Sequence, residues 1–177
     1  MEHLKKAIEV LIVLVGTIST LTGCNKVASA PELEAKQMMD ISQYSRITLD
    51  ELLTKLGEPL REDELIFKSP NGKEYPAMTY IFEIDHYPFE FIAVENTIVG
   101  LNLLNLENEE YKLKVDSHKE VLGLTGIIPG EDMVTLVEDA VTARYSSVND
   151  TVDEVWATMN NKSVDLLRVT FETEYIK

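Results

Sequence analysis

The chain has 177 residues, and its 31 aspartates and glutamates outnumber its 16 lysines and arginines, which gives a formal net charge of −15. A surplus of carboxylates repels phosphate backbones and anionic lipid headgroups, so the composition argues against nucleic-acid binding. The length allows one ordinary domain with a hydrophobic core, or two small domains packed together. Acidity of this kind is typical of a soluble surface, and a basic partner or a metal site is the less common cause.

The first 23 residues have the layout of a secretory signal. Lys5 and Lys6 precede an apolar stretch that starts at Val10 and ends in small residues. The uncharged run 10–23 is shorter than the roughly 20 apolar residues that a membrane-spanning helix needs. We therefore predict a cleavable leader over 1–23.

Leu21, Thr22 and Gly23 lead directly into Cys24, the only cysteine of the chain. This ending resembles the lipobox of bacterial lipoproteins, whose cysteine receives a diacylglyceryl group before cleavage. The resemblance implies that Cys24 carries acyl chains such as palmitate and anchors the protein to the extracytoplasmic face of the cell membrane, or to the outer membrane in a two-membrane cell. Several acyl chains hold a protein firmly, because each buried methylene contributes about 0.8 kcal/mol. An ordinary signal peptide that ends near a cysteine is the alternative.

Lipidation of Cys24 would leave the mature chain without a thiol. Disulfides, cysteine-bound zinc and a thiol nucleophile are then excluded, and packing alone must stabilise the fold. The polar, small residues that follow Cys24 predict a flexible tether over 24–45.

A helix packed on a sheet is expected over 46–106. Thr48 and Glu51 have the spacing of a capping box, and Gly57 stops the helix that they start. Its apolar face consists of Leu49, Leu52, Leu53 and Leu56. Three β-rich runs follow at 78–84, 89–94 and 97–103, joined by short turns at 85–88 and 95–96. Alternation of Phe89, Phe91 and Ala93 with Glu90 predicts an antiparallel meander with one face on the helix and the other in solvent.

The second half, 107–177, repeats this order after a charged connection. Ser117 and Glu120 form another capping-box pattern, a longer helix is expected over 131–144, and strands are expected at 153–159 and 164–172. The sequence thus predicts an α+β fold in which short helices pack on an antiparallel meander. The recurring order favours two tandem helix-on-sheet units, with a diverged repeat as one explanation.

The stretch Ile47–Leu103 resembles the envelope lipoproteins of the SmpA/BamE group and, more broadly, domains with the β-lactamase-inhibitor-protein-like fold. The motifs that carry this resemblance are Thr48-x-x-Glu51-Leu52-x-x-x-Leu56-Gly57-x-Pro59, Tyr80-x-Phe82, Glu90-Phe91-Ile92 and the strand from Val99 to Leu103. The resemblance implies an envelope lipoprotein that works by contacting other proteins. It covers about a third of the precursor, and its motifs concern the fold more than the role.

Motifs that would indicate chemistry are missing from the sequence. There is no H-E-x-x-H, no G-x-S-x-G and no glycine-rich phosphate loop. His86 and His118 have no metal-ligand neighbour at helical spacing, so we interpret both as exposed structural residues. We expect no enzyme activity, no cofactor and no metal site.

Aromatic side chains near the predicted turns are the best candidates for an interface. Rigid aromatic residues are common anchors of protein–protein contacts. The candidate interface residues are Tyr75, Tyr80, Tyr87 and Phe89. Alternatively, Tyr80 and Phe89 fill the core, and Trp156, inside an apolar strand, is expected there.

The function that these observations favour is a non-catalytic protein-binding or envelope-assembly module that is anchored to the membrane at Cys24 and contacts an unidentified envelope protein. An inhibitor or immunity-type protein, in which an acidic sheet face blocks a basic enzyme cleft, is the alternative. A lipid-anchored hydrolase is a third hypothesis, since two carboxylates brought together by folding could form a catalytic pair.

Overall fold

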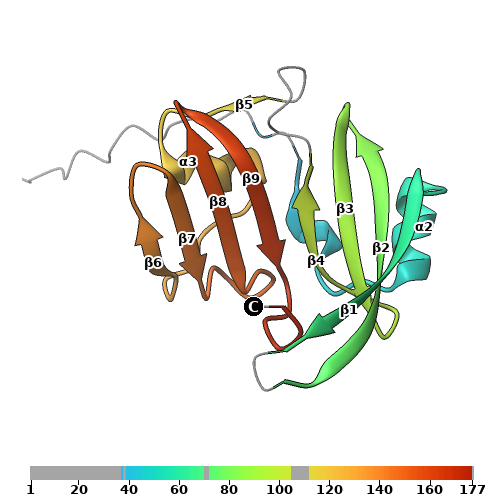
Figure 1. The fold of residues 1–177 in the computed structure, drawn as a ribbon. Helices are drawn as coiled ribbons and strands as arrows, with labels where there is room; N and C mark the ends of the chain where they lie inside the picture. The colour runs from blue at the N-terminus through green and yellow to red at the C-terminus, as the bar shows by residue number, and fades with distance from the viewer. Residues whose placement is uncertain (1–36, 38, 70–71, 105–111, 177) are drawn as a thin grey trace, which may run out of the picture. The chain divides into compact units, whose positions relative to one another are not determined.

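The computed structural model describes residues 37, 39–69, 72–104 and 112–176 (Figure 1). The predicted leader, the lipobox and Cys24 lie outside these residues, as do most of the predicted tether and the start of the connection after residue 104. No helix in the described part of the chain is long and apolar enough to cross a membrane.

The described residues form short helices and one large antiparallel sheet. The helices are η1 (Ile41–Tyr44), α2 (Leu49–Leu56) and α3 (His118–Leu124). The strands are β1 (Arg61–Lys68), β2 (Glu74–Ile84), β3 (Tyr87–Val94), β4 (Thr97–Leu103), β5 (Leu113–Lys114), β6 (Val134–Glu138), β7 (Thr142–Ser146), β8 (Glu154–Asn160) and β9 (Ser163–Thr170). This arrangement confirms the α+β class and the antiparallel sheet.

The strand order is β1-β2-β3-β4-β9-β8-β7-β6, and the short β5 pairs with β9 (Figure 1). Two runs of four consecutive strands therefore meet in the middle, where Gly100–Leu103 of β4 pairs with Leu167–Thr170 of β9. A short helix precedes each run. The halves share one continuous nine-stranded sheet, so two separate helix-on-sheet bodies are not observed, and a common origin of the halves stays a prediction.

Local signals explain the elements that the sequence predicted. The Thr48 hydroxyl accepts a hydrogen bond from the Glu51 N–H at 3.2 Å, and the Glu51 carboxylate accepts one from the Thr48 N–H at 2.8 Å. The capping box of α2 is thus confirmed, and Gly57, at φ +83°, ends the helix. Three hairpins turn on pairs of residues with positive φ, as two-residue type I′ turns require. These pairs are Asp85-His86, Glu95-Asn96 and Asn161-Lys162.

The capping box expected at α3 is incomplete. Ser117 occupies the N-cap position, but its side chain makes no capping hydrogen bond. Glu120 instead accepts a hydrogen bond from the Asp116 N–H at 2.8 Å. The spacing alone therefore predicted the start of the helix correctly and its cap wrongly.

The helix expected over 131–144 is wrong, because these residues form the β6–β7 hairpin. Val134, Thr135 and Val137 are β-branched and favour a strand over a helix. The Asp139 carboxylate then accepts hydrogen bonds from the N–H groups of Val141 and Thr142, both at 2.9 Å, which makes a tight turn where a helix would have to continue.

The predicted tether extends too far. Met39, Ile41 and Tyr44 are buried in the main core. The N–H of Ile41 also donates to the carbonyl of Thr125 at 3.0 Å, so this segment is fastened beside α3. Burial of these three apolar side chains gives the residues before Ser45 a structural role that a tether would lack.

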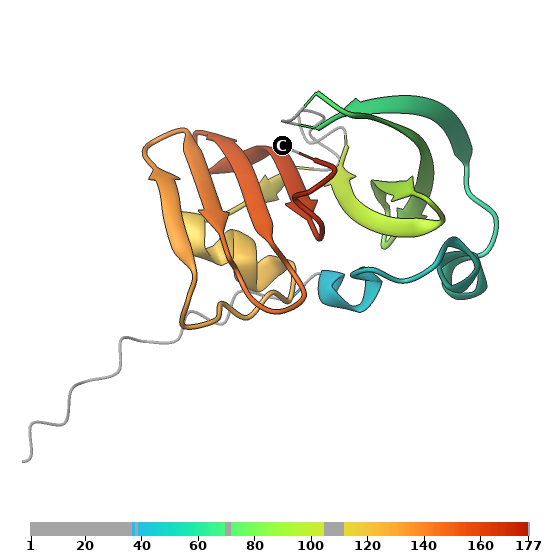
Figure 2. The same cartoon turned by 90° about the horizontal axis from the view of Figure 1, so that it is seen from below.

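Two clusters of buried side chains lie on opposite faces of the sheet. The main cluster includes Leu52 of α2, Leu122 of α3 and Phe91 of β3, so it lies between one face of the sheet and the helices. Figure 2 shows the helices on the same side of the strands. The smaller cluster places Ile176, near the C-terminus, against Val99 and its neighbours. The face expected to meet solvent is therefore partly covered by the C-terminal segment.

Candidate functional site

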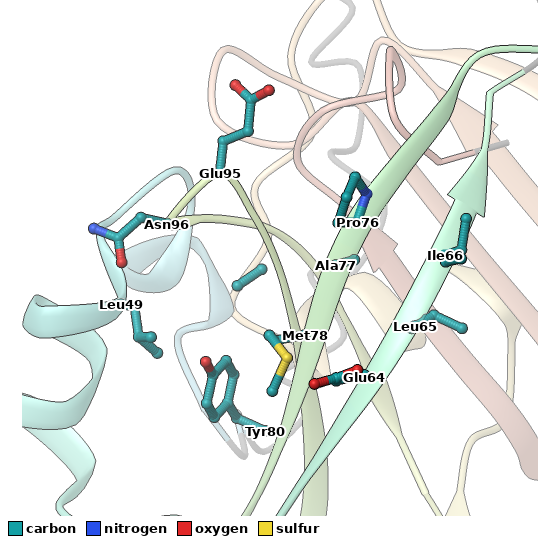
Figure 3. Close-up of a pocket in the computed structure, with 11 residues that line it drawn as sticks. Leu49, Glu64, Leu65, Ile66, Pro76, Ala77, Met78, Tyr80, Glu95 and Asn96 are labelled. Carbon is teal, nitrogen blue, oxygen red and sulfur yellow. The ribbon is translucent and has the colours of Figure 1, made fainter.

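An open groove of about 700 Å³ lies between α2 and the β1–β2 hairpin (Figure 3). Most of its lining is apolar. The lining residues are Leu49, Glu64, Leu65, Ile66, Pro76, Ala77, Met78, Tyr80, Ala93, Glu95 and Asn96. An apolar concave surface with a few polar groups at its rim is the usual form of a binding site.

The groove exists because α2 is too short to cover the whole hairpin. The helix has eight residues, and Leu52 fixes it over the main core. Glu64 of β1 pairs with Met78 of β2, and Ile66 pairs with Pro76. Directly opposed residues share one face of an antiparallel sheet, so this part of the hairpin presents its apolar surface to the groove without a helix over it.

The rim of the groove is negatively charged. Glu62 and Glu64 make no hydrogen bond or ion pair with any described residue. The two basic residues of β1 are already paired, Arg61 with Asp63 at 2.5 Å and Lys68 with Glu74 at 2.9 Å. The free carboxylates beside the apolar lining are therefore uncompensated.

Tyr80 connects the apolar lining with this charge. Its side chain lies in the groove between Leu49 and Met78 (Figure 3). Burial raises the pKa of the Tyr80 phenol, and the nearby charge of Glu62 raises it further. The phenol stays protonated at neutral pH and can donate a hydrogen bond to a bound group.

The structure does not bring the four predicted interface aromatics to one surface. Tyr80 lines the groove, whereas Phe89 is buried in the main core. Tyr75 packs edge-on against Tyr175, with ring centroids 4.8 Å apart, on the opposite face of the sheet. Tyr87 is half-buried at the start of β3. In this conformation Phe89 and Tyr75 offer no side chain to a partner, and an interface role for Tyr80 and Tyr87 stays a prediction.

Trp156 is half-exposed, contrary to its expected place in the core. The register of β7, β8 and β9 sets it between Arg144 and Arg168, whose guanidinium carbons lie 5.5 and 5.7 Å from its ring centroid. Arg144 holds Glu154 through two hydrogen bonds of 3.0 Å. These hydrogen bonds balance the charge of Arg144. The side chains of Arg144, Trp156 and Arg168 thus form a row that links β7, β8 and β9.

The two described histidines differ in exposure. The side chain of His86 is 95% exposed in a hairpin turn. His118 is only half-exposed at the start of α3, so its expected exposure is corrected. No group of three or more potential metal ligands occurs among the described residues.

Sequence reasoning found Tyr80 but missed Glu64 and Ile66, because it assigned no structure to 61–68. The run Leu65-Ile66-Phe67 was the available signal. The charged residues on either side of this run obscured its strand pattern, since both faces of an edge strand can carry polar residues.

No protein-family model matches the chain, and no curated protein sequence matches it. The solved structures that are similar to it include the following two. The first, a cysteine-rich secretory protein from Staphylococcus aureus, is 14% identical, with a TM-score of 0.41 and coverage of 75% of this chain and 46% of that one. The second, an extracellular protein containing an SCP domain from Bacillus anthracis, is 13% identical, with a TM-score of 0.40 and coverage of 84% and 50%. This chain spans about half the length of the structures it matches.

The expected resemblance to the SmpA/BamE group is wrong. No family model matches, and the similar structures are described as secretory and SCP-domain proteins. The resemblance depended on a capped helix followed by strands in which apolar and polar residues alternate. Such motifs indicate only that a short helix precedes a β-meander. Here the meander has a fourth strand, β1, and continues into a sheet of nine strands.

Proposed function

We propose that this chain is a lipid-anchored, extracytoplasmic, non-catalytic protein-binding module, and that the groove beside β1 is its binding site. The observation that carries the proposal is an open apolar groove with uncompensated carboxylates at its rim. The leader and the lipobox ending at Cys24 support the location, and the lack of catalytic motifs in the sequence supports a role in binding.

The groove suits an apolar side chain of a partner that also carries basic residues. Desolvated apolar anchors supply most of the affinity at protein interfaces. Charges at the rim increase the rate of encounter and select the partner, and Glu62 and Glu64 would select a basic one. A concave site receives a protruding segment, whereas an inhibitor inserts one, so the geometry favours a binding module over the inhibitor alternative.

The tandem organisation of the fold suggests an origin for the two halves of the chain. Each half consists of a short helix followed by four antiparallel strands, and the two runs meet at β4 and β9. We infer that the halves are diverged copies and that the groove belongs to the first copy.

In-cell cross-linking of the full precursor, tagged at its C-terminus in its own host, tests the proposed site. Ile66→Glu places a charge in the groove, and Ile128→Glu is the matched control at another exposed isoleucine; the two side chains are 62% and 80% exposed. We expect one envelope protein to be captured by the wild type and by the control, with at least a ten-fold loss for Ile66→Glu. Cys24→Ala should also lose the partner if the anchor places the chain beside it.

Equal capture by Ile66→Glu and the wild type would refute the groove as the site. Turnover of a substrate by the purified chain, abolished by changing one pair of carboxylates, would instead establish an enzyme.

A further inference from the structure

Among the described residues the strand order of the nine-stranded sheet ends in two edge strands with one neighbour each, β1 and β6, and they differ in how they are protected. β6 has five residues, and its pairing with β7 shifts register between Thr135 and Val137. Short, bulged edge strands resist the addition of another strand. β1 has eight residues and pairs with β2 without a register shift. The edge of β1 is therefore the better template for a further strand.

The free edge of β1 runs along the groove. Ile66 lines the groove, and Leu60, just before the strand, is 69% exposed. A strand added to this edge would place every second side chain over the groove and the others on the opposite face. Binding of this kind combines main-chain hydrogen bonds, which give affinity, with side-chain pockets, which give specificity.

The charge of β1 decides which strand can add. Glu62, Asp63 and Glu64 are consecutive, and among the described residues only Asp63 has a basic partner. A second copy of this chain paired so that the acidic segments align would bring the same three carboxylates against them, and like charges across a strand pair are destabilising. A segment with basic residues would instead compensate Glu62 and Glu64.

We propose that an extended segment with alternating apolar and basic residues adds to the free edge of β1 as a further strand, with its apolar side chains over the groove. This inference rests on the proposed function and specifies how the partner binds.

Photo-cross-linking from the full chain in its host separates the inference from the proposed function. Benzoylphenylalanine is placed in turn at Ile66, on the groove face, at Asp63, on the other face of β1, and at Leu136 on β6 as a control. An added strand contacts both faces, so we expect the same partner to be cross-linked from the positions of Ile66 and Asp63 and not from that of Leu136. Cross-linking from the position of Ile66 alone would overturn strand addition and leave the groove as a binding site. Cross-linking from the position of Leu136 alone would overturn both.

A peptide probe tests the chemistry directly. The probe is a fluorescent nine-residue peptide of alternating lysine and valine, titrated into the full chain in detergent. Two versions N-methylated at alternate residues block one edge or the other of the added strand. We expect one of these versions to bind at least ten-fold more weakly than the parent, and a glutamate–valine peptide to bind at least ten-fold more weakly as well. Equal affinity of all four peptides, or no binding by the lysine–valine parent, would overturn the inference.

Charge reversal supplies the matched variants. Glu62→Lys with Glu64→Lys should reverse the preference between the lysine and glutamate peptides. Glu131→Lys with Asp132→Lys, at exposed acidic positions outside the groove lining, should leave the preference unchanged. The same preference in both double variants would contradict recognition by the carboxylates of β1.

Discussion

Arg46 joins the start of the described chain to segments more than 100 residues away, and its removal should destabilise the fold measurably. Its guanidinium contacts the Glu172 carboxylate at 2.6 Å, the Asp153 carboxylate at 2.9 Å and the Asp150 carbonyl at 3.0 Å. It also donates a hydrogen bond to the Phe171 carbonyl. The Arg46 side chain is 33% exposed, so solvent screens these contacts only in part.

The expected magnitude follows from these contacts. Surface ion pairs contribute up to about 1 kcal/mol, and hydrogen bonds to charged groups contribute about 1.5–3 kcal/mol when well buried. After a discount for exposure, Arg46→Met should lower the free energy of unfolding by about 2–3 kcal/mol, because it keeps the aliphatic stem and removes these polar contacts. For a domain of this size the loss corresponds to a fall in Tm of roughly 5–10 °C.

Thermal unfolding followed by circular dichroism measures this loss. Arg61→Met is the matched control, because the Arg61 side chain is 66% exposed and pairs with Asp63 in its own strand. We expect the control to change the free energy of unfolding by less than about 0.5 kcal/mol. A Tm for Arg46→Met within about 2 °C of the wild type would refute the assigned role, since a partly buried cross-link of this kind should cost more.

Two further predictions concern local hydrogen bonds. Thr48→Ala removes the complete capping box of α2 and should lower the free energy of unfolding by about 1 kcal/mol in urea titrations. Ser117→Ala should lower it by less than about 0.5 kcal/mol, because the Ser117 side chain makes no capping hydrogen bond. Equal losses would contradict the difference between the two caps. Hydrogen bonds from the Val141 and Thr142 N–H groups lower the pKa of Asp139. Its stabilising contribution is therefore present above the unfolded-state pKa and lost as the pH falls through the lower folded-state pKa. Asp139→Asn keeps an acceptor oxygen but cannot titrate, so urea midpoints measured from pH 7 to pH 2 should fall less steeply below about pH 4 than in the wild type. An identical acid dependence in the two proteins would contradict this assignment.

The elements that could be predicted from the sequence have signals contained within a few residues. The capping box at Thr48 fixes the start of α2, and the alternation around Phe91 fixes β3. Short polar turns separate β2, β3 and β4, and the same holds for β8 and β9. Such signals do not depend on what the rest of the chain does.

The elements that could not be predicted depend on their place in the sheet. All five residues of β6 are exposed, so no buried face imposes a period of two on its sequence. Val134, Val137 and Val141 then fit helical spacing as well as strand spacing. β1 was missed for a related reason, since an edge strand has one neighbour and tolerates charge.

The proposed binding groove was only partly predictable. Tyr80 stood out as an aromatic residue near a turn, but a groove is a relation between elements. It requires the short α2 to lie over a hairpin whose first strand, β1, gives no clear signal in the sequence. Ile66 and Glu64 become candidates only when β1 is placed beside β2.

The two ends of the described chain are exchanged between the halves of the sheet. Ile41, which precedes the first run of strands, bonds to Thr125 after α3, and Phe171, which follows the last strand, donates its N–H to the carbonyl of Val99 on β4. Neither half is therefore a module that can be cut out intact. A chain that stopped at Thr170 would expose Val99 and its apolar neighbours to solvent. Unfolding of either half would likewise expose side chains of the other half that it buries. The exchange makes the two runs of strands a single cooperative folding unit.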